Sequence, residues 1–476
     1  MKDRTLSSSQ FVYDANVMQI KDKRMLKRGT GESKTKRMIE QVVSKKNMRY
    51  AYQQVLRNKG SAGVDGMRVS ELSLYAATHR DELCAHILLG SYLPQPILGV
   101  SIPKSNGKTR LLGIPTVVDR WLQQSVAQVI MPLFEVEFKP HSYGFRPNKN
   151  AHQCVQQAQA YIHEGYQHIV DIDLKSFFDE VDHGILLELV YRKVKCVATM
   201  RLIRKWLRAP MLIDGKLTKR RKGVPQGSPL SPLLSNIMLH ELDKHLEEEG
   251  YRYVRYADDF SIYCRRNHEA RKTGNSIFLF LKNKLRLPIN REKSGIRKPV
   301  NFEILGYRFT PVFEKGSKGK YQLIVSEKGW KRLKENLKSL TRKTAGQSLK
   351  TRLSKLKEVH RGWLNYYRMA NVHVKLKELD GWVRNRLRYC IWTDWKKQNR
   401  RRKNLILLGV PYKQAQGWSR TRMGGWAVAQ SPILVTTITL SRLARRGYES
   451  MLGYYLKSFP EKNRNVPLLF NEPPYT

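Results

Sequence analysis

Two adjacent carboxylates stand between two apolar runs of this chain, at a position where a tight turn is expected. Asp258 and Asp259 follow Tyr256-Ala257, and residues 251–255 and 260–264 carry the aromatic and β-branched side chains typical of strands. Like charges at the tip of a β-hairpin repel each other, and a bound divalent cation would remove that repulsion. For the pair on its own, a solvated Asp-Asp turn is the alternative interpretation.

A second acidic strand is predicted at residues 169–174, which alternate in character. The alternation places Asp171 and Asp173 together on one face of the strand. Two carboxylates on one face of a strand favour a bound cation there.

The composition narrows the class of partner. The chain has 476 residues, a formal net charge of +48 and a sequence pI of about 10.2, which favours a polyanion, and nucleic acid over membrane. No stretch approaches the roughly 20 apolar residues of a spanning helix, and the polar start lacks the apolar core of a secretory signal, so a cytoplasmic protein is expected. The five cysteines are odd in number and far apart, which argues against a disulfide framework and against zinc modules.

The character of the sequence changes along the chain. Residues 1–48 form a polar, basic extension, and strand and helix patterns alternate from about residue 92 to 309. Basic amphipathic helical patterns follow, including residues 330–337 and 353–367, and a final helix is expected from about Leu440 to Leu456. The tract Lys396–Lys403 is interpreted as a boundary or a phosphate-binding arm, with a solvated linker as the alternative.

Several further segments, taken in order with the Asp-Asp turn, resemble the palm motifs of reverse transcriptases. They are Asp173-Leu174-Lys175-Ser176-Phe177-Phe178, the loop from Gly223 to Pro232 with Pro225-Gln226-Gly227, Asn290-Arg291-Glu292-Lys293, and Leu305-Gly306-Tyr307. The segments Ile102-Pro103-Lys104, residues 112–120 and residues 142–147 are similar to the finger motifs of bacterial group II intron-encoded reverse transcriptase/maturases. Arg361-Gly362-Trp363-Leu364-Asn365-Tyr366-Tyr367 resembles the maturase, or X, region of that family.

The resemblance implies an α+β chain with a right-hand polymerase fold. Fingers and palm are expected at residues 49–310, after the 1–48 extension, and a helical thumb/maturase X domain at 311–403. A small C-terminal maturase/DNA-binding region is expected at 404–476. The end of the chain lacks the close cysteine pairs of an HNH endonuclease, so the endonuclease-lacking type is expected.

The resemblance also implies site residues. The metal site would comprise Asp173, Asp258, Asp259 and Leu174 and hold two Mg²⁺ ions, which suit all-oxygen ligands; Asp171 is the competing carboxylate. Lys293 is a candidate proton donor to pyrophosphate, although a lone lysine is more often solvated. By motif position, the resemblance implies nucleotide binding by Lys104, Arg110, Phe178 and Gln226, and Phe178 would exclude a 2′-hydroxyl. It implies template or primer binding by Tyr143, Arg146, Leu305, Gly306 and Tyr307. It implies intron RNA binding by Arg361, Trp363, Tyr366, Tyr367, Arg400, Arg401 and Arg402.

The function that this resemblance implies is RNA-directed DNA polymerisation together with maturase binding of intron RNA. The partners would be group II intron RNA, an RNA template, a DNA primer or target, and dNTPs. Two alternatives remain: a splicing cofactor that keeps the polymerase fold as a scaffold, and a reverse transcriptase recruited to another role such as defence. An unused site need not keep an acidic cluster, which argues against the first. The oligomeric state is left open.

Overall fold

A computed structural model describes residues 38–103, 107, 109–313 and 317–460. The chain divides into two compact units, Met1–Pro299 and Val300–Thr476. Lys104, predicted to bind nucleotide, and residues 1–37 of the predicted basic extension lie outside the described residues. No helix within the described ranges combines the length and the apolar character that a membrane crossing requires.

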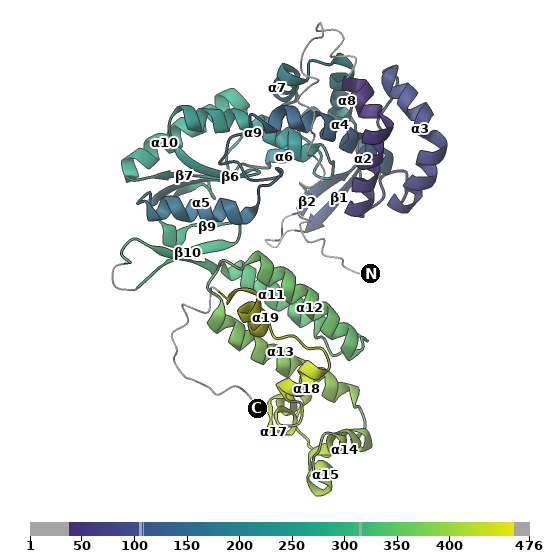
Figure 1. Cartoon of the computed structure of the whole chain (residues 1–476), viewed down its shortest axis with the longest axis vertical. Helices are drawn as coiled ribbons and strands as arrows, with labels where there is room; N and C mark the ends of the chain where they lie inside the picture. The colour runs from purple at the N-terminus through teal and green to yellow at the C-terminus, as the bar shows by residue number, and fades with distance from the viewer. Residues whose placement is uncertain (1–37, 104–106, 108, 314–316, 461–476) are drawn as a thin grey trace. The chain divides into compact units, whose positions relative to one another are not determined.

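The first unit contains two four-stranded sheets surrounded by helices (Figure 1). One sheet has the order β2-β1-β4-β5, with β1 (Ile97–Pro103), β2 (Thr109–Ile114), β4 (Met211–Ile213) and β5 (Lys216–Thr218). The other has the order β6-β7-β3-β8, with β3 (His168–Ile172), β6 (Arg252–Tyr256), β7 (Asp259–Cys264) and β8 (Gly295–Arg297). The α-helices are α2 (Lys45–Asn58), α3 (Leu72–Leu88), α4 (Val117–Glu135), α5 (Ala151–His163), α6 (Phe177–Glu180), α7 (His183–Val194), α8 (Val197–Arg208), α9 (Ser231–Glu248) and α10 (Asn267–Phe280).

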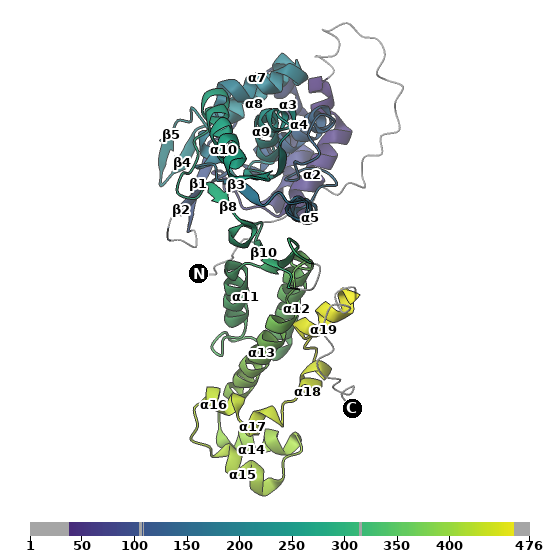
Figure 2. The ribbon, with the colours of Figure 1, turned by 90° about the vertical axis from the view of Figure 1, so that its left-hand side faces the viewer.

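The second sheet is covered by helices on both faces. Helix α10 contacts β3, β7 and β8, whereas α5 contacts β6, and the two helices lie on opposite sides of the sheet in Figures 1 and 2. Val170 and Ile172 of β3 belong to one large core that also includes Ile277 of α10 and Leu239 of α9. This burial explains the apolar residues Val170 and Ile172 of β3, whereas Asp171 of the same strand is only partly buried.

Local signals in the sequence begin several helices of this unit. The side chains of Ser44, Thr116 and Asn150 each accept a hydrogen bond from the backbone N–H three residues later, and so cap α2, α4 and α5. Asp182 caps α7 in the same way, accepting from two backbone N–H groups. The position of each helix start is therefore encoded locally.

The second unit is a small antiparallel sheet followed by helices (Figure 2). The sheet has the order β11-β10-β9, with β9 (Glu303–Ile304), β10 (Tyr307–Pro311) and β11 (Tyr321–Val325). The helices are α11 (Glu327–Leu340), α12 (Leu349–Tyr366), α13 (His373–Asp394), α14 (Gln398–Leu407), α15 (Tyr412–Ser419), α16 (Gly425–Gln430), α17 (Pro432–Val435), α18 (Leu440–Arg445) and α19 (Met451–Ser458). Helix α12 packs against α11 and α19, and α13 packs against α16, α17 and α19.

The prediction of one final helix from Leu440 to Leu456 is wrong, because the segment forms two helices, α18 and α19. Gly447, with φ of +98°, leaves the helical conformation after α18. The buried carboxylate of Asp380 then accepts hydrogen bonds from the N–H groups of Met451 and Leu452, both at 2.9 Å, at the start of α19. Ser450 also caps α19 by accepting from the N–H of Gly453, so a local and a long-range contact together define where the last helix begins.

Two expectations about segment boundaries also differ from the structure. Helix α2 begins at Lys45, so the expected boundary after residue 48 falls inside a helix whose Met48 is buried in the core. The tract Lys396–Lys403 is not a linker, because α14 begins at Gln398 within it. In α2 and in α14 the charged residues face solvent, whereas apolar residues of the same helix are buried.

Candidate active site

The predicted hairpin at the Asp-Asp pair is confirmed. Strands β6 and β7 pair antiparallel, with Tyr256 opposite Asp259, so that Ala257 and Asp258 form a two-residue turn. Ala257 has φ of +58°, the left-handed conformation that such turns require. Asp258 therefore lies in the turn and Asp259 is the first residue of the outgoing strand.

A buried arginine holds this turn. Arg255 is fully buried, and its Nε donates to Oδ1 of the equally buried Asp243 at 2.7 Å. Its Nη1 donates to the carbonyl oxygen of Ala257 at 2.9 Å and to Oδ1 of Asn236 at 3.1 Å. The guanidinium thus connects helix α9 to the backbone carbonyl that directly precedes Asp258.

Asp173 lies directly after β3 and faces the turn. Ile172 pairs with Phe260 in the antiparallel register of β3 and β7, and one further step places Asp173 opposite Asp259. One carboxylate oxygen of Asp173 contacts Nζ of Lys293 at 3.2 Å and accepts a hydrogen bond from Nδ2 of Asn290 at 3.0 Å. The structure therefore brings together the three predicted carboxylates and Lys293.

Burial and neighbouring negative charge both act on Asp258 and Asp259. Burial, followed by the negative charges of Asp258, Asp173 and Asp171, raises the pKa of Asp259 from 3.8 to about 7, and Lys293 opposes this shift. Burial is also the main cause that raises the pKa of Asp258. A cation placed among these groups would favour their ionised forms.

Asp171 has a different environment from the other carboxylates. Nε of Arg297 on the neighbouring strand β8 contacts Oδ2 of Asp171 at 2.7 Å. The charge of Asp171 is thus compensated within the sheet, and the choice of Asp173 over Asp171 as a metal ligand stays a prediction.

The residues fit a divalent cation by their chemistry. Across residues 38–103, 107, 109–313 and 317–460, no three His, Cys, Asp or Glu side chains are grouped closely enough to hold a metal ion as they stand. An all-oxygen donor set, with a carboxyl pKa raised by burial and by neighbouring carboxylates, is one that a hard cation stabilises. Leu174 follows Asp173 and forms an isolated bridge with Ile289.

The predicted nucleotide-binding residues of the first unit lie close together where they are described. Nε of Arg110, on β2, donates a hydrogen bond to Oε1 of Gln226. Phe178 lies on α6 and is half-buried, whereas its neighbour Phe177 is 2 % exposed and belongs to the core. The backbone N–H of Val224 donates to the carbonyl of Phe178 at 2.7 Å, which ties the Gln226 loop to α6.

The predicted template-binding loop is anchored by its own side chains. Arg146 is buried, pairs with Glu135 at 2.8 Å, and donates to the carbonyl oxygens of Lys139 and Ser142. Tyr143 is also buried. Their template contact stays a prediction, and it would involve the backbone and exposed neighbours of the loop more directly than these two side chains.

The predicted primer-binding turn lies in the second unit, between β9 and β10. Leu305 and Gly306 have φ of +51° and +80°, and a Cβ on Gly306 would lie 2.6 Å from Oη of Tyr367. Oη of Tyr366 donates to the carbonyl oxygen of Leu305 at 2.8 Å, and the hydroxyl of the fully buried Tyr307 donates to the carbonyl of Tyr366. The turn is therefore held by the C-terminal end of α12.

The residues predicted to bind intron RNA have three different environments. Trp363, Tyr366 and Tyr367 form an aromatic cluster beside the turn, with the rings of Trp363 and Tyr367 4.7 Å apart. Arg361 makes a two-point ion pair with Glu449 at 2.8 Å. On α14, Arg400 is exposed, Arg401 lies 4.4 Å from the ring of Trp392, and Arg402 lies 5.7 Å from that of Tyr412.

Sequence reasoning missed three residues that position the carboxylates, namely Arg255, Asp243 and Asn290. Asp243 gave a usable signal, since it is a charged residue within the apolar stretch of α9 around Leu242 and Leu246. Asn290 stood in a recognised motif, but only Lys293 of that motif was selected. Their roles depend on contacts between residues that are separated in sequence. Arg255 and Asp243 are 12 positions apart, and Asn290 and Asp173 are 117 positions apart.

Comparison with known proteins agrees with this arrangement. Residues 102–309 match the family described as reverse transcriptase (RNA-dependent DNA polymerase), and residues 330–406 match the family described as group II intron, maturase-specific domain. A reverse transcriptase domain generally implies catalysis that depends on divalent metal ions.

Individual relatives support both matches. Protein YkfC of Escherichia coli (strain K12) is 37 % identical over 199 residues, covering 40 % of this chain and 52 % of YkfC. The group II intron-encoded protein LtrA of Lactococcus lactis subsp. cremoris is 29 % identical over 325 residues, covering 54 % of each chain. The putative COX1/OXI3 intron 2 protein of Saccharomyces cerevisiae is 25 % identical over 411 residues, covering 67 % of this chain and 47 % of that protein. The matches thus span about half the length of these relatives. By these matches the chain is similar to group II intron-encoded reverse transcriptases and maturases.

Proposed function

We propose that this protein is an RNA-directed DNA polymerase that extends a primer on an RNA template with deoxynucleotides, and that it binds group II intron RNA as a maturase. The observation that supports the polymerase activity most directly is the convergence of Asp173, Asp258 and Asp259 at one end of the β3–β7 pair. Their mutual repulsion is the feature that a pair of bound cations relieves.

The proposed cofactor is Mg²⁺, held by the three carboxylates together with Leu174. The chemistry that two Mg²⁺ ions supply when bound is activation of the primer 3′-oxygen and stabilisation of the leaving pyrophosphate. Lys293 contacts Asp173 at 3.2 Å, so it reaches the same carboxylates and would release Asp173 when the cations compete for it. A lysine in that place can then donate a proton to pyrophosphate.

The nucleotide would be positioned by residues of both sheets of the first unit. Arg110 and Lys104 would bind the triphosphate, since guanidinium and ammonium groups stabilise charge on a transferring phosphoryl group. Gln226 orients Arg110 through their hydrogen bond. Phe178, fixed by the backbone contact between Val224 and its own carbonyl, would lie against the sugar and exclude a 2′-hydroxyl.

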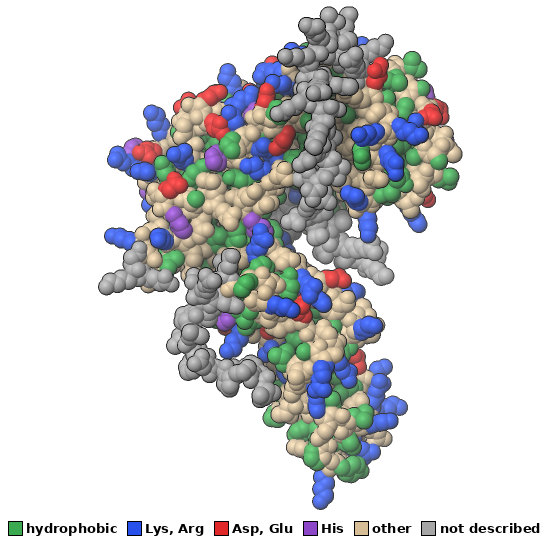
Figure 3. All heavy atoms as spheres, viewed as in Figure 1, with side chains coloured by type: hydrophobic (Ala, Val, Ile, Leu, Met, Phe, Trp, Pro, Cys, Tyr) green, Lys and Arg blue, Asp and Glu red, His purple; other side chains and the backbone are tan. Residues whose placement is uncertain are grey.

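The proposed maturase activity rests on the second family match and on the charge of the second unit. Figure 3 shows Lys and Arg side chains distributed over the visible face of the helices of this unit, with few acidic groups among them. Several of these cations lie on aromatic rings, such as Arg401 on Trp392, an arrangement that combines phosphate attraction with stacking. Group II intron RNA is the proposed ligand.

The polymerase proposal is tested by comparing Asp258→Asn with Asp171→Asn. The measurement is extension of a DNA primer on an RNA template by the full-length protein across a range of Mg²⁺ concentrations. We expect Asp258→Asn to lower the extension rate at least about 10³-fold, because a metal-bridging charge is lost. Asp171→Asn should extend at close to the wild-type rate, because Arg297 already neutralises Asp171.

Near-normal extension by Asp258→Asn, with both variants folded by circular dichroism, would contradict the proposed two-metal site. Absence of extension by the wild-type protein at every Mg²⁺ concentration, with primer–template binding intact, would contradict the polymerase function itself.

A further inference from the structure

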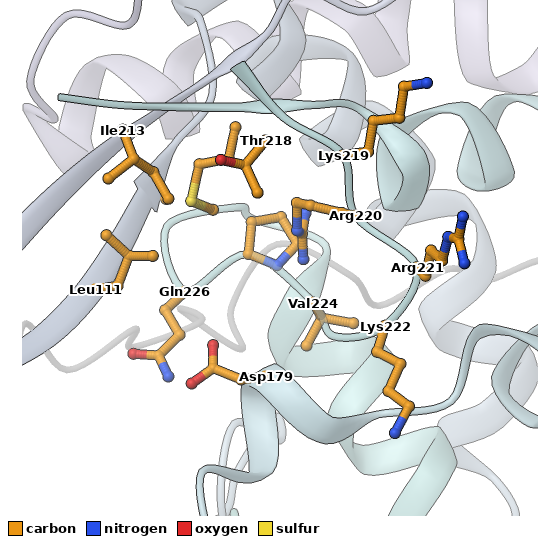
Figure 4. A pocket seen from close by; sticks show the side chains of 13 residues that line it. Leu111, Asp179, Ile213, Thr218, Lys219, Arg220, Arg221, Lys222, Val224 and Gln226 are labelled. Carbon is orange, nitrogen blue, oxygen red and sulfur yellow. The ribbon is translucent and has the colours of Figure 1, made fainter. Parts of the chain in front are cut away.

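A cavity of about 310 Å³ lies beside the Gln226 loop of the first unit. One wall is the sheet that contains β1 and β2, which contributes apolar side chains including Leu111 and Ile213. The other wall is the loop that leads from β5 to α9 and carries Arg220 and Gln226 (Figure 4). Because Gln226 accepts a hydrogen bond from Arg110, the cavity adjoins the candidate nucleotide-binding residues.

Four consecutive cations border this cavity: Lys219, Arg220, Arg221 and Lys222. Lys222 lies 3.6 Å from Glu180, but in the described part of the chain neither Lys219 nor Arg221 has an ion-pair partner. Both side chains are exposed and extend outward from the loop, whereas Arg220 reaches inward (Figure 4). The loop thus presents a row of positive charge whose balancing anions lie mostly outside the protein.

Arg220 is the innermost of these groups. Its Nη1 is buried and has no hydrogen-bond partner. Burial lowers the pKa of Arg220, and the nearby carboxylate of Asp179 opposes that shift. A buried guanidinium donor without a partner is unfavourable for the folded protein alone, and an anion entering the cavity would satisfy it.

The loop itself is rigidly placed. The N–H of Gly223 donates to the carbonyl of Val181 at 2.8 Å, and Gly223 has φ of +82° with a Cβ position only 2.8 Å from the carbonyl oxygens of Phe178 and Asp179. The close approach requires glycine and fixes the direction in which the preceding basic residues point. The row of cations is therefore positioned before any ligand binds.

We infer that this basic loop and the cavity behind it bind backbone phosphates of a single nucleic-acid strand, namely the unpaired part of the template. The assignment rests on the proposed polymerase function. Phosphate is the ligand group because a guanidinium accommodates two of its oxygens. A strand is favoured over a single small anion because successive cations along the loop match repeated phosphates, and the apolar wall can contact a base.

The test compares Lys219→Gln/Arg221→Gln with a matched control, Arg271→Gln/Lys272→Gln, which removes two exposed charges from α10 of the same unit. Binding of full-length protein to two labelled primer–template duplexes is measured by fluorescence anisotropy between 50 and 200 mM salt. One duplex has a 5′ single-stranded template overhang of ten nucleotides and the other is blunt. The KM for dNTP is measured on the overhang duplex.

For the overhang duplex we expect the cavity variant to reduce the slope of log K against log [salt] by about 1.4, since single strands contribute roughly 0.7 per phosphate neutralised. That reduction makes the fall in affinity between the two salt concentrations about sevenfold smaller than in the wild type. The blunt duplex and the KM for dNTP should be unaffected, and the control should differ from the wild type by the same small amount on both duplexes.

The variant Arg220→Gln separates a binding role of Arg220 from a purely structural one, through its melting temperature and its affinity for the overhang duplex. Because Nη1 lacks a partner, the melting temperature should be unchanged or higher, while affinity for the overhang duplex falls at least threefold. A lower melting temperature together with unchanged affinity would make Arg220 a structural residue and overturn its assignment.

Equal loss on blunt and overhang duplexes, or a slope equal to that of the control, would overturn the inference. A rise in the KM for dNTP with unchanged duplex affinity would place the nucleotide triphosphate in the cavity and would also overturn it. In each of these cases the wild-type protein would still extend primers, so the proposed polymerase function fails only on its own test.

Discussion

Replacement of Asp259 by Asn should stabilise the protein in the absence of metal while abolishing primer extension. Burial and the carboxylates of Asp258, Asp173 and Asp171 raise the pKa of Asp259 from 3.8 to about 7. The folded protein therefore binds a proton that the unfolded chain releases over roughly pH 4–7, so folding stability falls as the pH rises through this window. Above pH 7 the folded protein bears the full free-energy cost of ionising Asp259. The Asn variant has no carboxylate at this position and so lacks that cost.

The expected size of the effect follows from this shift. A change of about 3 pKa units corresponds to about 4 kcal/mol as an upper limit. Although many protein atoms surround the carboxylate, Asp259 is an exposed residue, so solvent screening reduces this limit and we expect about 1–2 kcal/mol. For a unit of this size that corresponds to a melting temperature about 2–6 °C higher at pH 8.

The assay is thermal unfolding of the full-length protein in EDTA at pH 5 and pH 8, followed by addition of Mg²⁺ at pH 8. The difference between Asp259→Asn and the wild type should be larger at pH 8 than at pH 5, and Mg²⁺ should raise the melting temperature of the wild type more. Glu248→Gln, which removes an exposed carboxylate from α9, is the control and should show no pH-dependent difference. An identical shift at both pH values, or a lower melting temperature for the variant at pH 8, would refute the argument from repulsion.

Three further predictions concern other parts of the molecule. Phe178→Ala should lower the ratio of kcat/KM for dNTP over rNTP by about 10- to 100-fold, because the space beside the sugar opens; an unchanged ratio would remove Phe178 from sugar selection. Tyr366→Phe, which deletes the 2.8 Å hydrogen bond to Leu305, should raise the Kd for primer–template about fivefold without changing the KM for dNTP, since one such bond contributes about 1 kcal/mol. Equal effects on both constants would argue against a positioning role. Arg400→Gln/Lys403→Gln, on the exposed side of α14, should reduce the salt slope of intron RNA binding by about 1.5 and leave extension of a short primer intact; equal loss of both activities would indicate no separate RNA-binding surface there.

The aromatic residues of the maturase motif illustrate where sequence reasoning reached its limit. Trp363, Tyr366 and Tyr367 were predicted to bind RNA, yet the hydroxyls and rings of the two tyrosines contact the turn at Leu305 and Gly306. The contact joins residues 61 positions apart, and nothing in either segment alone indicates the other as its partner. Packing against the turn does not remove the RNA-binding prediction, but it provides a physical reason for these residue types that needs no RNA.

The sequence by itself determined the features that depend on local patterns. Strand patterns and turn residues placed the β6–β7 hairpin correctly, capping residues determined the starts of α2, α4 and α5, and the order of short motifs indicated the families that the comparisons match. These signals are read within a few residues, where backbone conformation follows from residue type.

Only the tertiary structure decided which partners compensate the charges of the site carboxylates and which basic side chains are available to bind a ligand. It showed that Asp171 is paired with Arg297 whereas Asp173 contacts Lys293, that Arg146 is used inside its own loop, and that Nη1 of Arg220 is buried without a partner. The physical reason is that burial and charge compensation are properties of neighbours in space. In this chain those neighbours lie up to 126 positions away in sequence, as Asp171 and Arg297 do.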